Sequence, residues 1–290
     1  MSPTRPILRY HGGKWRLAPW IIGHFPSHRI YVEPFGGAGS VLLQKARTYS
    51  EVYNDLDGEV VNLFQVVRDR GDELARLIEL TPFSRDEFNL AYQESPDPME
   101  RARRTMVKAF MGFGSAAVTQ DSPSSPGAGF KPSTGFRSDT KRAFTSPAHD
   151  WYNYPGAIPL LIARLRGVVI ENRPATKLIA THDSPETLFY ADPPYVHGTR
   201  DLRKHRTPQS YRFEMSDVDH ADLAECLRAC EGMVVLSGYP CELYDRLYEG
   251  WQCVEKEAFA DGARSRTECL WLNPACQAAL GESGLFAVPS

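Results

Sequence analysis

Four consecutive residues, Asp192-Pro193-Pro194-Tyr195, combine groups that can hold an exocyclic amine. The two prolines fix φ at successive positions and remove two backbone donors. A carboxylate, a carbonyl oxygen and an aromatic ring therefore remain to face a ligand. The two acceptors would hold the amine hydrogens while the ring stacks on a flat heterocycle, which leaves the nitrogen lone pair available for attack. A rigid corner that only ends a strand is the structural alternative.

A glycine-rich turn, FGGAGS at 35–40, follows a short β-prone run at 30–32 and precedes residues with helical spacing. Such a turn lets the backbone approach a ligand and directs helix N–H groups toward it. Asp55 ends the next expected strand, where an acidic side chain can accept hydrogen bonds from both ribose hydroxyls of a nucleoside. The glycines alone are equally typical of a tight turn, but the series of strand, turn, helix, strand and acid favours a nucleoside ligand.

These motifs together resemble the Dam-like DNA adenine N6-methyltransferases, which use S-adenosylmethionine. The matching segments, in chain order, are RYHGGK at 9–14, VEPFGGAGS at 32–40, YND at 53–55 and FYADPPY at 189–195, followed by His220 and Leu223. Because they occur in the family's order over most of the chain, the resemblance implies the family's fold, its reaction and double-stranded DNA as the substrate.

The resemblance also assigns roles to individual residues. The cofactor-binding residues that it implies are Tyr10, Lys14, Phe35, Gly37, Gly39, Asp55 and Asp192. Tyr10 and Lys14 would lie against the methionine end of the cofactor, and the phenylalanine and glycines would wrap its amino-acid and ribose portions. The target amine would be held at 192–195, where Pro193 offers its carbonyl oxygen and Pro194 stiffens the corner.

The expected reaction is a direct in-line methyl transfer from the sulfonium to N6 of adenine. A sulfonium is already a good methyl donor, so the protein supplies orientation and electrostatics, and neither a metal nor a covalent nucleophile is expected. Asp192 and the Pro193 carbonyl would orient the amine, and Tyr195 would stack on the adenine. In a duplex the base must first be flipped into the pocket, at a cost of a few kcal/mol.

Two basic stretches are candidates for DNA contacts. Just past Tyr195, Arg200, Arg203 and Lys204 would border the mouth of a base-flipping pocket and contact phosphates. Arg137 lies in a long segment rich in Ser, Pro, Gly and Thr and would read base edges in the major groove. A solvated, mobile charged loop is the alternative for the stretch after Tyr195. For the basic run at 101–108, a solvated helix face is as consistent with the sequence as a DNA contact.

The elements that position these residues form an alternating α/β pattern. The β-prone runs fall at 30–32, 51–55, 167–170, 187–190, 233–236 and 268–272. A strand, a glycine-rich turn, a helix and a strand over 30–75 form a βαβ unit, which implies a parallel sheet. We therefore predict an α/β fold, a Rossmann-like class I methyltransferase sheet built from 1–75 and 158–290. A mostly helical target-recognition domain is expected as an insertion at 76–157.

Composition limits the class of protein. Of the 290 residues, 42% are hydrophobic and 24% are charged, and the net charge is −3, which argues against DNA binding through global positive charge. Neither an apolar run long enough to span a bilayer nor a signal sequence is visible, so we expect a cytoplasmic protein without a membrane partner. A monomer acting on one strand at a time would suffice.

The cysteines do not suggest a metal module. They are Cys226, Cys230, Cys241, Cys253, Cys269 and Cys276. No CxxC motif is present, and no histidine pair stands at finger spacing, so the expectation is no metal and reduced, mostly structural thiols.

Two rival functions remain. The amine at N4 of cytosine would fit the same corner, although the combination of GGK and EPFGGAGS favours adenine. A dinucleotide-binding oxidoreductase or a ligand sensor without turnover would explain the glycine-rich turn. The double proline after a strand argues against this second rival, because a hydride-transfer site has no use for it.

Overall fold

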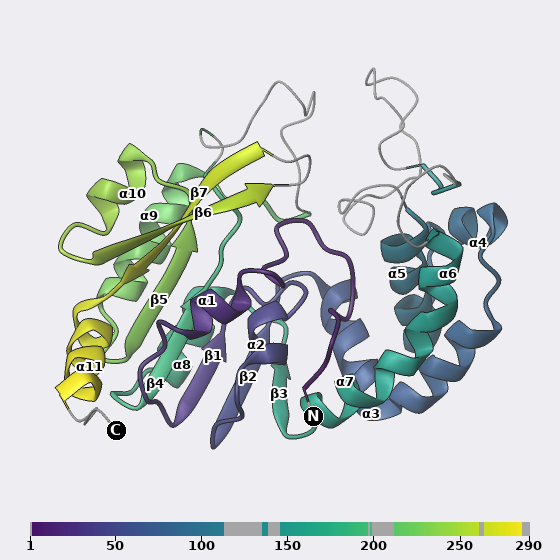
Figure 1. The fold of residues 1–290 in the computed structure, drawn as a ribbon, viewed down its shortest axis with the longest axis horizontal. Helices are drawn as coiled ribbons and strands as arrows, with labels where there is room; N and C mark the ends of the chain where they lie inside the picture. Colours follow the sequence, from purple (N-terminus) through teal and green to yellow (C-terminus); the bar gives the residue numbers. More distant parts are fainter. Residues whose placement is uncertain are drawn as a thin grey trace.

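The centre of the molecule is a seven-stranded sheet with helices on both faces (Figure 1). The structure is a computed structural model that describes residues 2–112, 135–138, 146–196, 198, 212–260 and 264–285. The strands are β1 Ile30–Glu33, β2 Ser50–Asn54, β3 Val168–Glu171, β4 Thr187–Ala191, β5 Met233–Gly238, β6 Gln252–Ala260 and β7 Arg264–Leu272. The predicted runs account for all of them except β6, whose mixed polar sequence QCVEKEAFA carries no continuous apolar signal.

The strand order is β3-β2-β1-β4-β5-β7-β6. Strands β1 to β5 pair in parallel, whereas β7 is antiparallel to both β5 and β6. The chain builds outward from β1 to β2 and β3, then returns to place β4 on the other side of β1. Open α/β sheets bind ligands at such a reversal, outside the carboxyl ends of the strands. The predicted α/β fold with a mainly parallel sheet is confirmed, and it is consistent with a Rossmann-like methyltransferase.

Both faces of the sheet are buried, and successive strand residues divide between them as the pleat requires. Tyr31, Tyr53 and Tyr190 face one hydrophobic cluster. Their neighbours Val32, Val52 and Phe189 face the other. Burial on both sides explains why the parallel strands are continuous apolar runs rather than alternating ones.

The helices divide between these two clusters. Those that contribute side chains to the tyrosine side are α1 Ala18–Ile22, α2 Ser40–Gln44, α3 Gly58–Leu80, α4 Arg85–Leu90, α5 Pro98–Met111, α6 Pro147–Asn153, α7 Ile158–Leu165 and α11 Pro274–Leu285. Those on the opposite side are α8 Ala175–His182, α9 Asp217–Arg228 and α10 Glu242–Leu247. Within the described part of the chain, no helix has the length and apolar character to cross a membrane.

Helices α3 to α7 gather beyond the edge strand β3, with the 3-10 turn η2 (Tyr154–Ala157) leading into α7 (Figure 1). Strands from before and after 76–157 lie in one sheet. The predicted division at residue 75 falls inside α3, which continues to Leu80 with non-helical backbone angles at Arg70. The domain boundary therefore remains a prediction that does not coincide with the end of an element.

The arginines of the basic run in α5 form ion pairs with glutamates of this group of helices. Arg101 binds Glu59 of α3 at 2.7 Å, and Arg103 and Arg104 both bind Glu100, each at 2.7 Å. Arg103 is buried, with 6% of its surface exposed. The solvated face that the sequence allowed is thus not observed for these arginines: Arg101 joins α5 to α3, Arg103 also contacts Glu87 of α4, and Arg104 pairs within α5.

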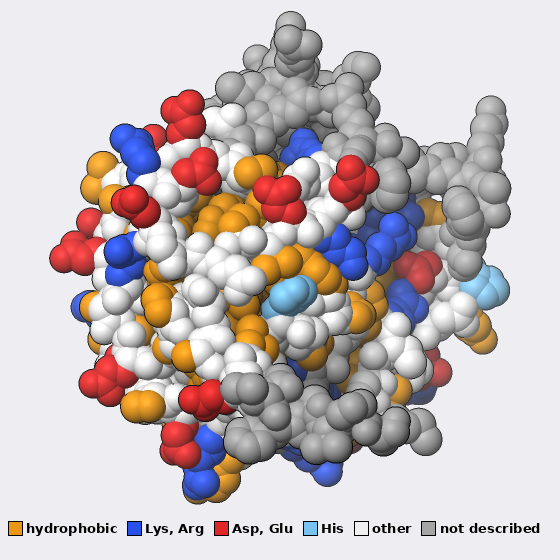
Figure 2. All heavy atoms as spheres, turned by 60° about the vertical axis from the view of Figure 1, so that its left-hand side comes forward, with side chains coloured by type: hydrophobic (Ala, Val, Ile, Leu, Met, Phe, Trp, Pro, Cys, Tyr) orange, Lys and Arg blue, Asp and Glu red, His pale blue; other side chains and the backbone are white. Residues whose placement is uncertain are grey.

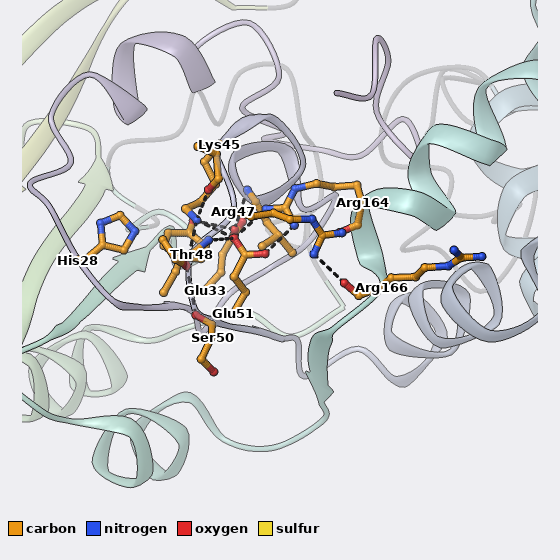
Figure 3. A network of polar contacts seen from close by, with 12 residues as sticks. His28, Glu33, Lys45, Arg47, Thr48, Ser50, Glu51, Arg164 and Arg166 are labelled. Atoms are coloured by element: carbon orange, nitrogen blue, oxygen red, sulfur yellow. Dashed lines mark hydrogen bonds and ion pairs between the residues drawn. The ribbon is translucent and has the colours of Figure 1, made fainter. Parts of the chain in front are cut away.

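A buried ionic network joins α7 to the sheet (Figure 3). Glu51 of β2 accepts hydrogen bonds from Lys45 Nζ at 2.7 Å and from Arg164 Nη1 at 2.6 Å. A second bond from Arg164 Nη2, at 2.9 Å, completes a bidentate pair. Burial would raise the pKa of Glu51, but its hydrogen bonds to Arg164 and Lys45 and their positive charges outweigh burial and lower it. One carboxylate therefore compensates two buried cations.

We predict that Glu51→Gln lowers the free energy of unfolding by about 3–5 kcal/mol, because it leaves buried cations uncompensated. The loss is measured by urea denaturation at neutral pH. A matched control, Glu79→Gln, removes an exposed pair with Arg76 and should cost less than about 1 kcal/mol. Because the pKa of Glu51 is depressed, its contribution is present above the unfolded-state value of about 4.3 and is lost as the pH falls through the folded-state value. Equal losses in the two variants would contradict the assignment.

Candidate functional site

A cavity of about 350 Å³ lies at the carboxyl ends of the parallel strands. This volume is within the range of small-molecule sites, roughly 300–1,000 Å³. Its walls come from the N-terminal segment, from the loops after β1, β2, β3 and β4, and from the start of α9. The lining includes Lys14, Glu33, Phe35, Asp55, Arg173, Asp192 and Met215. The cavity thus occupies the position that the strand order predicts for a ligand site.

Two glycines of the FGGAGS turn have different structural roles. Gly37 has φ +48°, and a Cβ there would lie 3.1 Å from the Tyr10 ring, on the cavity wall. Gly39 has φ +60°, and a Cβ there would lie 2.9 Å from the Phe64 ring. Because Gly39 is absent from the cavity lining, its role in this structure is to begin α2 and to allow Phe64 to pack. The prediction that Gly39 contacts the cofactor remains untested.

Asp55 closes one end of the cavity and is tied to the glycine-rich turn. Its Oδ2 accepts from the backbone N–H of Gly37 at 2.7 Å, and its Oδ1 accepts from that of Asp57 at 2.7 Å. A carboxylate has about four acceptor positions, so each oxygen retains capacity for a hydroxyl donor. Burial raises the pKa of Asp55 to about 6, against the effect of these backbone bonds.

Glu33 is a cavity residue to which the sequence analysis assigned no role. Its Oε2 accepts from the Tyr31 hydroxyl at 2.9 Å and from the Leu42 backbone at 3.0 Å. Burial raises its pKa to about 8, so the carboxyl is protonated at neutral pH. Its position as the last residue of β1, two residues before Phe35 of the glycine-rich turn, is the sequence signal that would have identified it.

Lys14 and Asp192 form an ion pair that joins the N-terminal segment to the loop after β4. Lys14 Nζ lies 3.1 Å from Asp192 Oδ1 and also donates to the Gly12 carbonyl at 2.9 Å. The lysine is buried, with 5% of its surface exposed. Ser237, at the end of β5, donates to the same Oδ1 at 2.6 Å. The sequence suggested a turn at the pocket wall for 237–240, whereas Ser237 lies within β5; its bond to Asp192 could not be foreseen, because it arises only from the adjacency of β4 and β5.

Among the described residues, the side-chain contacts of Asp192 all involve Oδ1. Its Oδ2 therefore remains as an acceptor beside the cavity. An oxygen in this position can accept a hydrogen from an amine of the ligand without losing the contacts that orient the carboxylate. The role predicted for Asp192 in holding the target amine remains a prediction.

Tyr195 is buried behind the cavity rather than in its lining. Its hydroxyl donates to Glu268 of β7 at 2.8 Å, and its ring meets Tyr239 edge-on with centroids 4.4 Å apart. Lys14 Nζ lies 4.6 Å from the centre of the same ring. The ring orientation is therefore set by three different elements, and the predicted stacking on a base remains a prediction.

The cavity gathers most of the cofactor-binding residues that the sequence analysis named. Those in the lining are Tyr10, Lys14, Phe35, Gly37, Asp55 and Asp192, with Pro194 from the expected amine-holding corner. Pro193 lies between two lining residues but is itself buried outside the lining. The cavity also has a wall that sequence reasoning missed, where Arg212 donates to the buried Asp57 at 3.0 Å.

The predicted DNA contacts are only partly within the described residues. Arg200, Arg203 and Lys204 lie outside them. Arg137 is described: its backbone N–H donates to Met111 and its guanidinium donates to the Phe110 carbonyl at 3.1 Å. This contact places a cation at the carboxyl end of α5, where the helix dipole favours positive charge. A base-reading role for Arg137 remains a prediction.

The surface of the described part carries both signs of charge. Figure 2 shows acidic side chains scattered over the left-hand part of one face and several Lys and Arg side chains grouped right of centre. This mixture agrees with the net charge of −3. A polyanion would therefore be bound through a local basic surface rather than through a uniformly positive face.

Comparison with known proteins identifies relatives of one kind. Residues 10–112 match the model of the family described as D12 class N6 adenine-specific DNA methyltransferase. A DNA adenine methylase of Serratia marcescens is 30% identical over 115 residues, which are 38% of this chain and 42% of that protein. A DNA adenine methylase of Escherichia coli K12 is 32% identical over 114 residues, covering 35% of this chain and 39% of that protein. The matches thus span about two fifths of these relatives.

A further relative matches over a much longer stretch. The type II methyltransferase M1.LlaDCHI of Lactococcus lactis subsp. cremoris is 24% identical over 285 residues, which are 90% of this chain and 90% of that protein. The family match contains the glycine-rich turn and Asp55, whereas the corner at 192–195 falls outside it. The long match to the Lactococcus protein extends the similarity beyond the N-terminal motifs.

The protonated state of Glu33 leads to a pH-dependent stability. Its folded-state pKa of about 8 exceeds the unfolded value of about 4.3, so folding takes up a proton between these limits. The contribution of Glu33 to stability therefore falls as the pH rises, by about 1.4 kcal/mol per pH unit. Glu33→Gln, which stays neutral, removes this dependence. Urea denaturation at about pH 5.5 and about pH 7.5 checks it: the variant gains stability relative to the native protein at the higher pH. Identical slopes would contradict the assignment.

Proposed function

We propose that this chain, which is similar to the D12 class of N6 adenine-specific DNA methyltransferases over residues 10–112 and to a type II methyltransferase over most of its length, transfers a methyl group from S-adenosylmethionine to N6 of adenine in double-stranded DNA. The observation that supports this most directly is the placement of Asp192 beside a nucleoside-sized cavity, held by Lys14 and Ser237. An amine acceptor and a cofactor pocket are thereby adjacent, as a direct transfer requires.

The cavity fits S-adenosylmethionine in volume and in the chemistry of its walls. Asp55 offers acceptor positions for ribose hydroxyls, and Phe35 and Leu56 offer apolar surface for the adenine ring. The positive φ of Gly37 allows the backbone to form the wall without a side chain projecting into the space. When bound, this cofactor supplies an activated methyl group on a sulfonium.

The remaining chemistry belongs to the residues of the chain. Asp192 Oδ2 and the Pro193 carbonyl accept the two hydrogens of the target amine and so direct its lone pair toward the cavity. Lys14 and Ser237 hold the Asp192 carboxylate in place through Oδ1. Asp192 need not be a strong base, because the amine proton becomes acidic only as the new bond forms.

The target adenine reaches this corner by flipping out of the duplex, because N6 is inaccessible in stacked DNA. We assign recognition of the DNA sequence to the region at 76–157, which lies between β2 and β3 in the sequence and whose described part includes α4, α5 and α6. Phosphate contacts next to the flipped base are assigned to Arg200, Arg203 and Lys204, which follow Tyr195 in the sequence. The protein acts on DNA without a membrane partner, and a monomer suffices for one strand.

The experiment that tests the reaction is methylation with a labelled donor. DNA is incubated with the protein and labelled S-adenosylmethionine, then digested to nucleosides and separated. Label on N6-methyldeoxyadenosine is the expected result. Label on N4-methyldeoxycytidine would move the substrate to the other exocyclic amine, and absence of label with a variety of DNA sequences would favour a ligand-binding protein without turnover.

Asp192→Asn should reduce the methylation rate by about 100- to 1,000-fold, the range observed when one preorganised polar contact at a reacting centre is removed. Asparagine keeps the size of the side chain but replaces one acceptor oxygen with an NH₂ group. This group cannot accept a hydrogen bond from the target amine. The rate is measured under single-turnover conditions with saturating cofactor. Asp69→Asn, an exposed carboxylate on α3, is the matched control. A near-native rate for Asp192→Asn would remove this residue from the mechanism.

Asp55→Asn should weaken cofactor binding by about 10- to 100-fold, since hydrogen bonds to a charged acceptor contribute about 1.5–3 kcal/mol. Hydroxyl donors stabilise the ionised form, and the pKa of Asp55 is raised to about 6. Cofactor affinity of the native protein should therefore fall as the pH drops below this value, and the variant should lose that dependence. Calorimetric titration at several pH values measures both effects. An unchanged affinity in the variant would show that the ribose lies elsewhere.

A further inference from the structure

Cys253 of β6 and Cys269 of β7, which have no part in the proposed methyl transfer, lie near each other on adjacent antiparallel strands. Cys253 stands opposite Trp271, and Glu255 stands opposite Cys269. Directly opposed residues project from the same face of a sheet, as do residues two apart on one strand. Cys253, Glu255 and Cys269 therefore share one face, the side covered by α9 and α10.

The three side chains form a compact set of ligand atoms. The two sulfur atoms and a carboxylate oxygen all lie within 4.8 Å of one another. Cys253 and Glu255 are exposed, whereas Cys269 is fully buried beneath them. In the described part of the chain, this is the one cluster of Cys, His, Asp and Glu side chains with such spacing. An ion at this position would be accessible to solvent on the side of Cys253 and Glu255, and Cys269 would anchor it to the hydrophobic core.

The strand register disfavours a disulfide between these cysteines. Cys253 and Cys269 are diagonal rather than directly opposed, and diagonal neighbours lie about 7–8 Å apart. A disulfide needs Cα atoms about 4.4–6.8 Å apart. The two geometries also differ in the distance between the sulfur atoms. It is about 2.0 Å in a disulfide but nearly 4 Å when two metal–sulfur bonds of about 2.3 Å meet at a tetrahedral ion, so a metal ion suits cysteines that are farther apart.

The carboxylate of Glu255 lies within 4.8 Å of both sulfur atoms. Its negative charge favours a cation at this position, and a bound dication stabilises the thiolate forms of its cysteine ligands directly.

We propose that Cys253, Glu255 and Cys269 bind one thiophilic divalent cation, with Zn²⁺ the expected ion. Thiolate ligands select soft metals, and two sulfur atoms with one carboxylate oxygen leave a fourth tetrahedral position for water. On binding, each thiol releases its proton to solvent and forms a sulfur–metal bond, so no oxidation or reduction occurs. The ion would clamp the edge strand β6 to β7, the strand that carries Glu268 and thereby holds the Tyr195 hydroxyl.

The test is titration of the full-length, reduced protein with Cd²⁺ as a spectroscopic substitute for Zn²⁺. Binding to thiolates produces a sulfur-to-cadmium charge-transfer absorption in the ultraviolet. We expect one saturable site per chain, with Zn²⁺ displacing the cadmium signal and with proton release on binding. Cys253→Ser and Cys269→Ser should abolish tight binding at this site, and Glu255→Gln should weaken it by about 10- to 100-fold, as expected for the loss of one contributing group.

Cys241→Ser is the matched control. Cys241 is a half-buried cysteine at the N-cap of α10, a position where serine is favoured, and the cadmium signal should be unchanged. Because Cys269 is buried, circular dichroism of its variant checks folding, and the exposed Glu255→Gln provides an independent measure. A tight cadmium signal that persists in both Cys253→Ser and Glu255→Gln would overturn the proposal. This readout does not depend on methylation activity.

Discussion

The ion pair between Lys14 and Asp192 is the interaction on which the site depends. A lysine with 5% of its surface exposed requires a counter-ion, and Asp192 Oδ1 supplies it at 3.1 Å. The pair joins the N-terminal segment to the loop after β4, so one contact positions both a wall of the cavity and the carboxylate proposed to accept the amine. Ser237 adds a neutral donor to the same oxygen, so the side-chain contacts of Asp192 in the described part of the chain fall on Oδ1 alone.

The carboxyl groups around the cavity differ in protonation because their surroundings differ. Glu33, fully enclosed at the end of β1, has its pKa raised to about 8, whereas that of Asp55, which also accepts two backbone N–H bonds, is raised only to about 6. At neutral pH the first is a neutral donor and acceptor and the second is an anion. A single edge of the sheet therefore presents two carboxyl groups with different chemistry, which suits a ligand carrying both hydroxyls and charged groups.

Buried ion pairs also organise the region beyond β3. Glu51 compensates Lys45 and Arg164, and the arginines of α5 are paired with glutamates of α3 and α5 itself. A run of basic residues that resembles a nucleic-acid surface in the sequence is thus used largely inside the protein. Sequence alone cannot separate these uses, because an arginine that joins two helices and one that contacts a phosphate have the same identity and helical spacing.

The sequence by itself determined the α/β pattern, the glycine-rich turn and the identities of Asp55 and Asp192, because these depend on local chain stereochemistry and on residue type. It also placed these residues at strand ends, and parallel strands bring such ends to one edge. Tertiary structure alone decided the partners: Ser237 at Asp192, Glu268 at Tyr195 and Cys253 beside Cys269. These contacts join strands that are neighbours only in the assembled sheet, and strand order and register arise from packing of the whole core rather than from any local stretch of chain.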